Sequence, residues 1–198
     1  KFMASSYTPL GIEKMATGEN AGTWGTKTNA NLDLIEQVLG GYKAVSIAGG
    51  AQTTALTVAD GALTGTAQAR MIEFTGSITG NQIVTIPLDV ETFYFLRNST
   101  SGAYTVQFKY ASGSGDSFTF SATDKGDAIV FATASDGTNP NIDTIALGIS
   151  NVVEDTSPQL GGNLDTNNNN IVTTSNRDLM LYPNGTGAVE VGGNDNPG

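Results

Sequence analysis

The sequence predicts a mainly β protein with one short helix near its N-terminus, and three observations support this prediction. Apolar and polar residues alternate over most of the chain, which is the period of a half-buried strand. Gly, Asn and Ser cluster between these segments, as turns require. A helical period appears only within residues 24–39. We therefore expect an N-terminal arm and helix (1–43), a β domain (44–150), and a linker with the beginning of a shaft (151–198).

The arm and the helix precede the sheet pattern. Residues 3–22 are expected to be extended, because their apolar residues have no regular spacing and form no core of their own. The helix is expected to begin at Trp24 after an N-cap at Thr23, and to stop at Gly40-Gly41. One narrow, mostly apolar face follows the helical spacing, and its residues are Trp24, Thr28, Leu32, Ile35 and Leu39.

The β domain is expected to be one antiparallel β-sandwich of about nine strands, with a jelly-roll-like winding. Antiparallel pairing is expected because no helix of crossover length separates the strands. Alternation places one set of side chains on a common face, namely Tyr104, Val106, Phe108 and Tyr110. Ile129 and Phe131 share a face opposite Val130. The continuous apolar run 93–96 predicts a strand buried on both sides.

The chain changes character after Ile149. A linker is expected at 152–158, followed by short strands at 171–174, 179–182 and 188–191, with a turn at Asn184-Gly185 between the last two. Each of these strands is too short to bury itself. Such segments become stable when identical chains wrap together around one axial core, so we predict the start of a trimeric β shaft and a homotrimer.

The composition restricts the chemistry. The 198 residues include 38% hydrophobic and 14% charged residues, with a net charge of −10, and neither His nor Cys is present. The usual catalytic triad, the Cys–His pair, disulfides and common zinc sites are thereby excluded. No Lys or Arg run exists to replace phosphate counterions, and no apolar run approaches the roughly 20 residues that cross a bilayer. We expect no enzyme, no cofactor, no metal, no direct nucleic-acid binding and no membrane insertion.

Two polar clusters have both a chemical and a structural interpretation. Asp136, Asn139, Asn141 and Asp143 carry oxygen ligands of the kind that calcium takes, but their spacing is not that of an EF-hand, so a polar turn is favoured. Asp165 with the following Asn residues is interpreted in the same way, as a solvated linker or an Asn ladder. Asp89 and Glu91 could form a glycosidase pair, yet they follow Pro87 and predict a turn that leads into the next strand.

Three motifs resemble tail-fibre-like structural proteins of marine bacteriophages. GENAGTWGTKTN at residues 18–29 resembles their N-terminal region, EDTSPQLGGNLD at 154–165 resembles a segment that introduces a shaft, and LYPNGTG at 181–187 resembles their shaft repeats. The resemblance implies a trimeric fibre in the virion, docked on tail proteins such as an adaptor or nozzle ring. A distal region beyond Gly198 would bind the host receptor, which makes this chain the proximal part of a longer polypeptide.

Other assignments remain open. The same sandwich could belong to a capsid decoration protein or head fibre attached to the shell, to a polysaccharide depolymerase whose catalytic part lies elsewhere, or to a bacterial adhesin. For the fibre, we predict that residues 3–22 lie extended against another virion protein. The candidate interface residues are Tyr7, Pro9, Leu10, Ile12, Met15 and Trp24. Trp24 could instead pack on its own chain and anchor the helix there.

Overall fold

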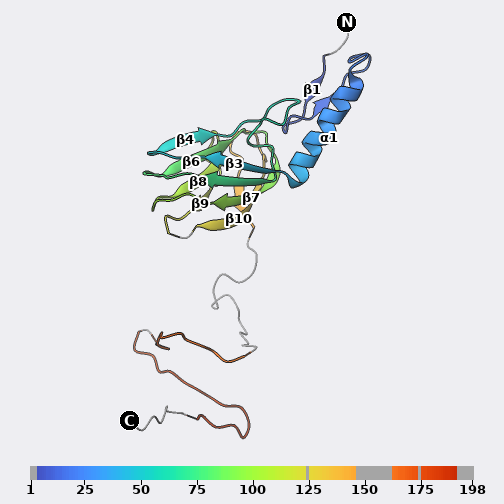
Figure 1. The fold of residues 1–198 in the computed structure, drawn as a ribbon. Helices are drawn as coiled ribbons and strands as arrows, with labels where there is room; N and C mark the ends of the chain where they lie inside the picture. The colour runs from blue at the N-terminus through green and yellow to red at the C-terminus, as the bar shows by residue number, and fades with distance from the viewer. Residues whose placement is uncertain (1–3, 124, 146–161, 174, 191–198) are drawn as a thin grey trace, which may run out of the picture. The chain divides into compact units, whose positions relative to one another are not determined.

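The protein is mainly β with one short helix, as the sequence predicts. The computed structural model describes residues 4–123, 125–145, 162–173 and 175–190. The chain divides into two units, Lys1–Ser150 and Asn151–Gly198. The described part of the first unit contains one helix, and its eleven strands form three sheets (Figure 1). The arm, the helix and the β domain thus belong to one compact unit.

Helix α1 spans Trp24–Gly40, which agrees with the predicted bounds to within one residue. Thr23 occupies the N-cap position, but its side chain makes no capping hydrogen bond there. The helix ends where Gly41 turns into extended backbone and donates its N–H to the carbonyl of Gln37 at 2.8 Å. Of the helix residues, only Leu34 is buried. The apolar stripe therefore does not anchor α1 on its own chain.

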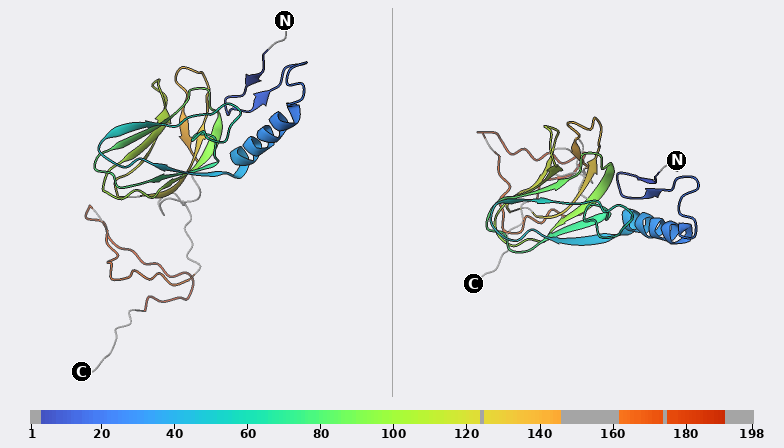
Figure 2. Two further views of the ribbon diagram at one scale, coloured as in Figure 1. Left: turned by 45° about the horizontal axis from the view of Figure 1, so that its top comes forward. Right: turned by 90° about the horizontal axis from the view of Figure 1, so that it is seen from above.

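The arm does not remain extended as predicted. Strands β1 (Ser6–Tyr7) and β2 (Glu13–Lys14) pair antiparallel in a small hairpin beside α1 (Figure 2). The connecting turn closes through the N–H of Gly11, which donates to the carbonyl of Thr8 at 2.8 Å. Gly11 has a φ of +79°, and a Cβ at this position would lie 2.7 Å from the carbonyl oxygen of Ala59. Glycine is needed here because the turn lies directly against the β domain.

The nine remaining strands, which match the predicted number, form two larger sheets. The five-stranded sheet has the order β11-β10-β7-β5-β3, and its strands in that order are Ile142–Thr144, Gly126–Ala132, Thr92–Asn98, Met71–Thr75 and Tyr42–Ser46. The four-stranded sheet has the order β4-β6-β8-β9, and its strands are Gln52–Ala55, Gln82–Ile86, Val106–Tyr110 and Phe118–Phe120.

The prediction of antiparallel, jelly-roll-like pairing is wrong. Strands β3, β5 and β7 pair in parallel, and so do β4, β6 and β8. Within these two sheets, antiparallel pairs occur only at β8–β9, β7–β10 and β10–β11. Between β3 and β8 the chain alternates between the sheets, so a strand of the facing sheet supplies the crossover that parallel pairing needs. Sequence reasoning considered only helices for this role.

The parallel strands stack as three successive turns of the chain. Tyr42 lies opposite Met71, which lies opposite Phe95, and Gln82 lies between Gln52 and Val106 in the other sheet. The stacking continues around the bends, where the N–H of Ile47 donates to the carbonyl of Thr75 at 2.9 Å. Each turn of the chain is thus aligned with the next along its strands and its bends. Equivalent positions of segments that are distant in the sequence therefore lie side by side.

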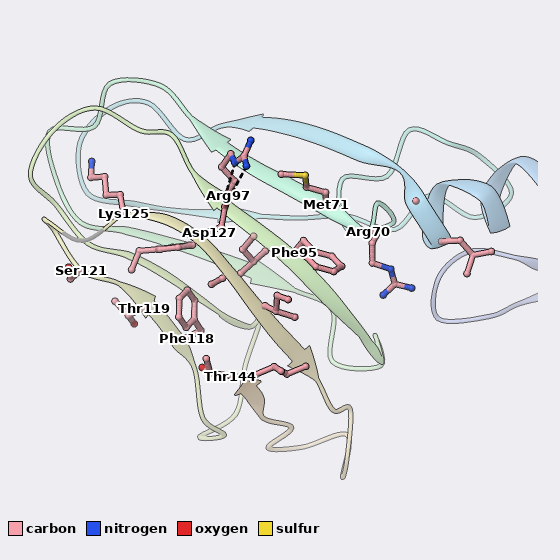
Figure 3. A pocket seen from close by; sticks show the side chains of 17 residues that line it. Arg70, Met71, Phe95, Arg97, Phe118, Thr119, Ser121, Lys125, Asp127 and Thr144 are labelled. Atoms are coloured by element: carbon pink, nitrogen blue, oxygen red, sulfur yellow. Dashed lines mark hydrogen bonds and ion pairs between the residues drawn. The ribbon is translucent and has the colours of Figure 1, made fainter. Parts of the chain in front are cut away.

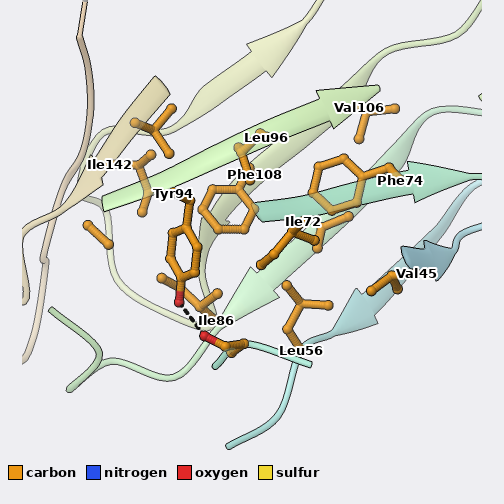
Figure 4. Close-up of a cluster of buried hydrophobic side chains, with 14 of the residues drawn as sticks. Val45, Leu56, Ile72, Phe74, Ile86, Tyr94, Leu96, Val106, Phe108 and Ile142 are labelled. Carbon is orange, nitrogen blue, oxygen red and sulfur yellow. Dashed lines mark hydrogen bonds between the residues drawn. The ribbon is translucent and has the colours of Figure 1, made fainter. Parts of the chain in front are cut away.

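The hydrophobic core lies between the two sheets (Figure 4). The ring of Phe108 packs against Phe74 and Tyr94 of the facing sheet, with centroid distances of 6.3 and 5.6 Å. The hydroxyl of buried Tyr94 donates to the carbonyl of Ala67 at 2.7 Å. The predicted inward face is confirmed for Val106, Phe108 and Tyr110, whereas Tyr104 precedes β8 and is 38% exposed.

Strand β7 is central in its sheet but is buried on one face only. Tyr94 and Leu96 are buried, whereas Phe93 and Phe95 are 44% and 42% exposed, so the prediction of burial on both sides is wrong. In β10 the predicted alternation is present, with Val130 facing the core while Ile129 and Phe131 on the other face are only half-buried. Side chains on the outer face of the five-stranded sheet stay partly exposed because the four-stranded sheet covers only its inner face.

The second unit has a different character. Its described residues, 162–173 and 175–190, contain no helix and no strand, so the short predicted strands are not formed there. The predicted turn at Asn184-Gly185 is present, because the N–H of Gly187 donates to the carbonyl of Asn184 at 3.2 Å. The linker predicted at 152–158 lies outside the described residues.

Candidate interaction surface

The candidate calcium cluster holds turns together. Asp136 accepts the N–H groups of Thr138 and Asn139 at 2.8 and 2.5 Å. The side-chain oxygen of Asn141 accepts the N–H of Asp116 at 2.8 Å. The side-chain oxygen of Asn139 accepts the N–H of Ser114 at 2.8 Å, so three of the four cluster residues are engaged by backbone donors. Among the described residues, no group of three or more His, Cys, Asp and Glu side chains lies close enough to hold a metal ion.

The candidate carboxylate pair lies where the sequence predicts a turn. Asp89 is part of a turn in which the N–H of Val90 donates to the carbonyl of Pro87 at 3.3 Å, and β7 begins shortly after Glu91. Both carboxylates are exposed. The structural interpretation of this pair as a turn is thus confirmed.

The predicted attachment residues are only partly available to a partner. Leu10 packs against the core, and its carbonyl accepts the side-chain N–H of Gln68 at 2.8 Å. The half-buried members of the predicted set are Tyr7, Leu10 and Ile12. The exposed members are Pro9, Met15 and Trp24. The arm thus fills a surface of its own unit, and its outward side presents three of the six residues.

A polar contact fixes the arm on α1, and sequence reasoning did not find it. The carboxylate of Glu13 lies 3.0 Å from the Lys27 ammonium nitrogen, although the Glu13 side chain is only 4% exposed. The side chain of Asn31 accepts the N–H of Glu13 at 2.9 Å and donates to its carbonyl at 2.8 Å. The hydrogen bond with Lys27 lowers the pKa of Glu13, and the same bond raises the pKa of Lys27. Asn31 is a weak helix former, and its two hydrogen bonds to the arm explain its place within α1.

The predicted apolar face of α1 points to solvent. Trp24, Leu32 and Leu39 are 64%, 58% and 68% exposed, so the interpretation of Trp24 as an anchor on its own chain is wrong. Buried Leu34 and Lys27 lie on another side of the helix, and Asn31, next to the apolar stripe, also bonds the arm. An apolar stripe on a helix is normally covered. None of the residues that the structure describes covers the exposed side chains of this stripe.

A second apolar surface, here called the outer row, crosses the outer face of the five-stranded sheet. Strand register aligns one residue from each strand, and the row consists of Tyr42, Met71, Phe95, Ile129 and Ile145. Ile145, the last described residue of the segment, donates its N–H to the carbonyl of Ile129 at 2.9 Å. None of these five residues was identified from the sequence as outward-facing.

Charged side chains lie beside the outer row. The guanidinium of Arg97 makes two hydrogen bonds to Asp127, at 2.7 and 2.9 Å, and these bonds lower the pKa of Asp127 (Figure 3). Ser99 donates to Glu73 at 2.5 Å, and Tyr42 also donates to this carboxylate; both bonds lower the pKa of Glu73. These charges are satisfied by neighbours on the same sheet.

The outer row borders a pocket of about 1060 Å³. Figure 3 shows Phe95 of β7 and Phe118 of β9 on either side of β10. Arg70 lies at the same face with its guanidinium 4.4 Å from the ring centre of Phe93. Leu39, from the exposed stripe of α1, also lines this pocket. The helix stripe and the outer row therefore meet at the end of α1.

The outer row could have been found only in part from the sequence. Alternation in β7 could have separated Phe95 from Tyr94, but the apolar run 93–96 hides that period. The alignment of Phe95 with Tyr42 depends on parallel stacking, which short-range patterns do not encode.

Comparisons of the chain with protein-family models, with curated proteins and with solved structures find no match. In the part of the chain that the structure describes, no helix has the length and apolar character needed to cross a bilayer. The features that can indicate function are therefore the exposed apolar surfaces and the sequence motifs.

Proposed function

We propose that this chain is a structural protein of a phage virion, the proximal region of a trimeric tail fibre. One observation carries the proposal. All large apolar side chains described in the second unit are exposed, and they are Leu164, Ile171, Val172, Leu179, Met180, Leu181, Tyr182 and Val189. An apolar segment that forms no core alone gains one from a partner. Identical chains wound together as a β shaft would provide it.

The first unit would serve as a rigid spacer in this fibre. Its two facing sheets share a core, and this sandwich-like body would connect the attachment end to the shaft. The motif at 18–29 covers the start of α1, and this end of the unit would dock on a tail protein such as an adaptor or nozzle ring. A distal region outside this sequence would bind the host receptor.

The docking contact would be made by a folded surface rather than by a free strand. Pro9, Met15 and Trp24 are exposed, while Leu10 is tied to Gln68. Aromatic residues contribute strongly to buried interfaces, so Trp24 is the residue expected to matter most. The proposal assigns no catalytic step, no cofactor, no nucleic acid and no membrane insertion to this chain.

The test combines solution and particle measurements. Sedimentation of the full chain should give a trimer, and imaging of particles carrying a labelled chain should place it on the tail. A label on the shell would favour the alternative of a head fibre or decoration protein. A stable monomer in assembled particles would overturn the trimeric fibre, and cleavage of host polysaccharide by the purified chain would overturn its non-enzymatic role.

A further inference from the structure

The exposed stripe of α1 has the spacing of a coiled-coil seam. Thr28, Leu32, Ile35 and Leu39, here called the seam, are separated by 4, 3 and 4 positions. A step of three followed by a step of four places Leu32 and Leu39 at heptad position a, and Thr28 and Ile35 at position d. The seam is therefore a heptad pattern in which Leu32, Ile35 and Leu39 are 58%, 40% and 68% exposed, while Thr28 is half-buried.

The residue types at these positions favour more than two helices. Leu at a with Ile at d shifts coiled coils from dimers toward trimers and tetramers. We propose that three copies of this chain pack their α1 helices in parallel through the seam, around the axis of the fibre. This inference rests on the proposed trimeric fibre and assigns it a second oligomer contact, separate from the shaft.

The helix has no alternative face for this contact. Leu34 is buried, and Lys27 and Asn31 bond to Glu13 of the arm. Rotation of α1 to hide the seam on its own chain would break these contacts. The arm thus fixes which side of the helix a second copy meets.

The charges around the seam permit parallel packing. The seam itself has no charged residue, and the flanking e and g positions are Trp24, Asn29, Asn31, Glu36 and Val38. In a parallel bundle, a g residue of one helix meets the following e residue of the next. Glu36 therefore meets the position of Asn31, whose side chain is held by the arm of its own chain, and no like-charge pair forms between e and g positions.

The apolar surface also continues beyond the helix. Leu39 lines the same pocket as Met71 and Phe95 of the outer row. Three copies joined at the seam would therefore bring apolar sheet surfaces near one another at the end of α1. A seam of about two heptads is short for an independent coiled coil. If the shaft of the same molecule is trimeric, it holds three α1 helices near one another and raises their effective concentration.

The absence of Cys makes a direct test possible in the full chain. Leu32→Cys and Leu39→Cys place one thiol each in the seam, and Asp33→Cys places one on an exposed position beside it. A short bismaleimide should give covalent dimers with both seam variants and none with Asp33→Cys. Self-linking at both seam positions requires a parallel arrangement. Equal cross-linking of the Asp33→Cys control would mean that the covalent dimers form by random collision of chains, and it would overturn the proposal.

Sedimentation of the same unlinked samples separates the two proposals. A trimer without covalent product at either seam position would place the contact elsewhere and overturn this inference, while the fibre proposal would stand. A monomer would overturn both. The double variant Leu32→Glu/Leu39→Glu should raise the dissociation constant at least about tenfold without loss of circular dichroism, because both side chains are exposed in the single chain. Unchanged assembly of this variant would also contradict the seam.

Discussion

The Glu13 carboxylate lies 3.0 Å from the Lys27 ammonium nitrogen and is almost fully buried, so an ion pair holds the arm on α1. The pKa of Glu13 is lower in the folded chain, so folding favours the ionised carboxyl. This contribution is present above the unfolded pKa of about 4.3 and is lost as pH falls through the folded pKa. The raised pKa of Lys27 contributes below the unfolded pKa of about 10.4, and that part is lost as pH rises through the folded value.

Glu13→Gln should loosen the arm, because it leaves the Lys27 ammonium without its carboxylate. Hydrogen exchange of residues 5–14 should become faster at neutral pH while exchange in the core strands stays unchanged. Acid should loosen the arm of the parent chain as Glu13 is protonated, and this acid-induced loosening should largely disappear in the variant. Glu36→Gln, on the exposed side of α1, is the control and should match the parent. An arm that stays protected in Glu13→Gln would show that Asn31 and Gln68 suffice.

Phe108→Ala should destabilise the first unit by about 3–5 kcal/mol, because it opens a cavity between the two sheets where Phe74 and Tyr94 pack. Urea unfolding measures this change. Phe93→Ala is the control on the outer face, where the main loss is the contact with Arg70, and it should cost about 1 kcal/mol or less. Equal losses in the two variants would contradict the assignment of inner and outer faces.

Gly102→Ala should destabilise the stacked turns more than Gly137→Ala. Both glycines have positive φ, +99° and +68°, so each substitution carries a backbone cost of about 1–2 kcal/mol. At Gly102 the new Cβ would lie 2.2 Å from the carbonyl oxygen of Ile78, whereas nothing lies within 4 Å of a Cβ at Gly137. The difference should therefore reach a further roughly 1–3 kcal/mol. Identical urea midpoints would argue against close stacking of these turns.

Tyr94 and Tyr110 should resist ionisation in alkali. Burial raises the pKa of Tyr94, and it raises that of Tyr110 to about 12, while the Tyr110 hydroxyl donates to the carbonyl of Val90 at 2.7 Å. The stability from this protonated hydroxyl is complete below the unfolded pKa of about 10 and is lost as pH rises through the folded value. Tyrosinate absorbance should therefore show a late step coupled to unfolding.

The late step should become smaller in Tyr110→Phe, because this variant lacks one of the two buried hydroxyls. If all six tyrosines of the chain titrated together before unfolding, the burial of these two hydroxyls would be contradicted.

The sequence by itself determined those features that depend on neighbours in the chain. The helix at Trp24–Gly40 follows from its 3.6-residue period and terminal glycines, and the inward set Val106, Phe108 and Tyr110 follows from alternation. The turn at Asn184-Gly185 follows from local backbone preference. Each of these signals is complete within a few residues, so no knowledge of distant segments is needed.

Only the tertiary structure decided the parallel pairing, the exposure of the seam and the folded arm. Tyr42 and Phe95 share a row because Met71 lies between them, and strand register over such separations leaves no local pattern. The stripe on α1 is a narrow apolar face, but whether that face meets its own sheet is fixed by the bonds of Glu13 to Lys27 and Asn31, which set the rotation of the helix. These features depend on which distant surfaces come together, and that is a property of the packed chain.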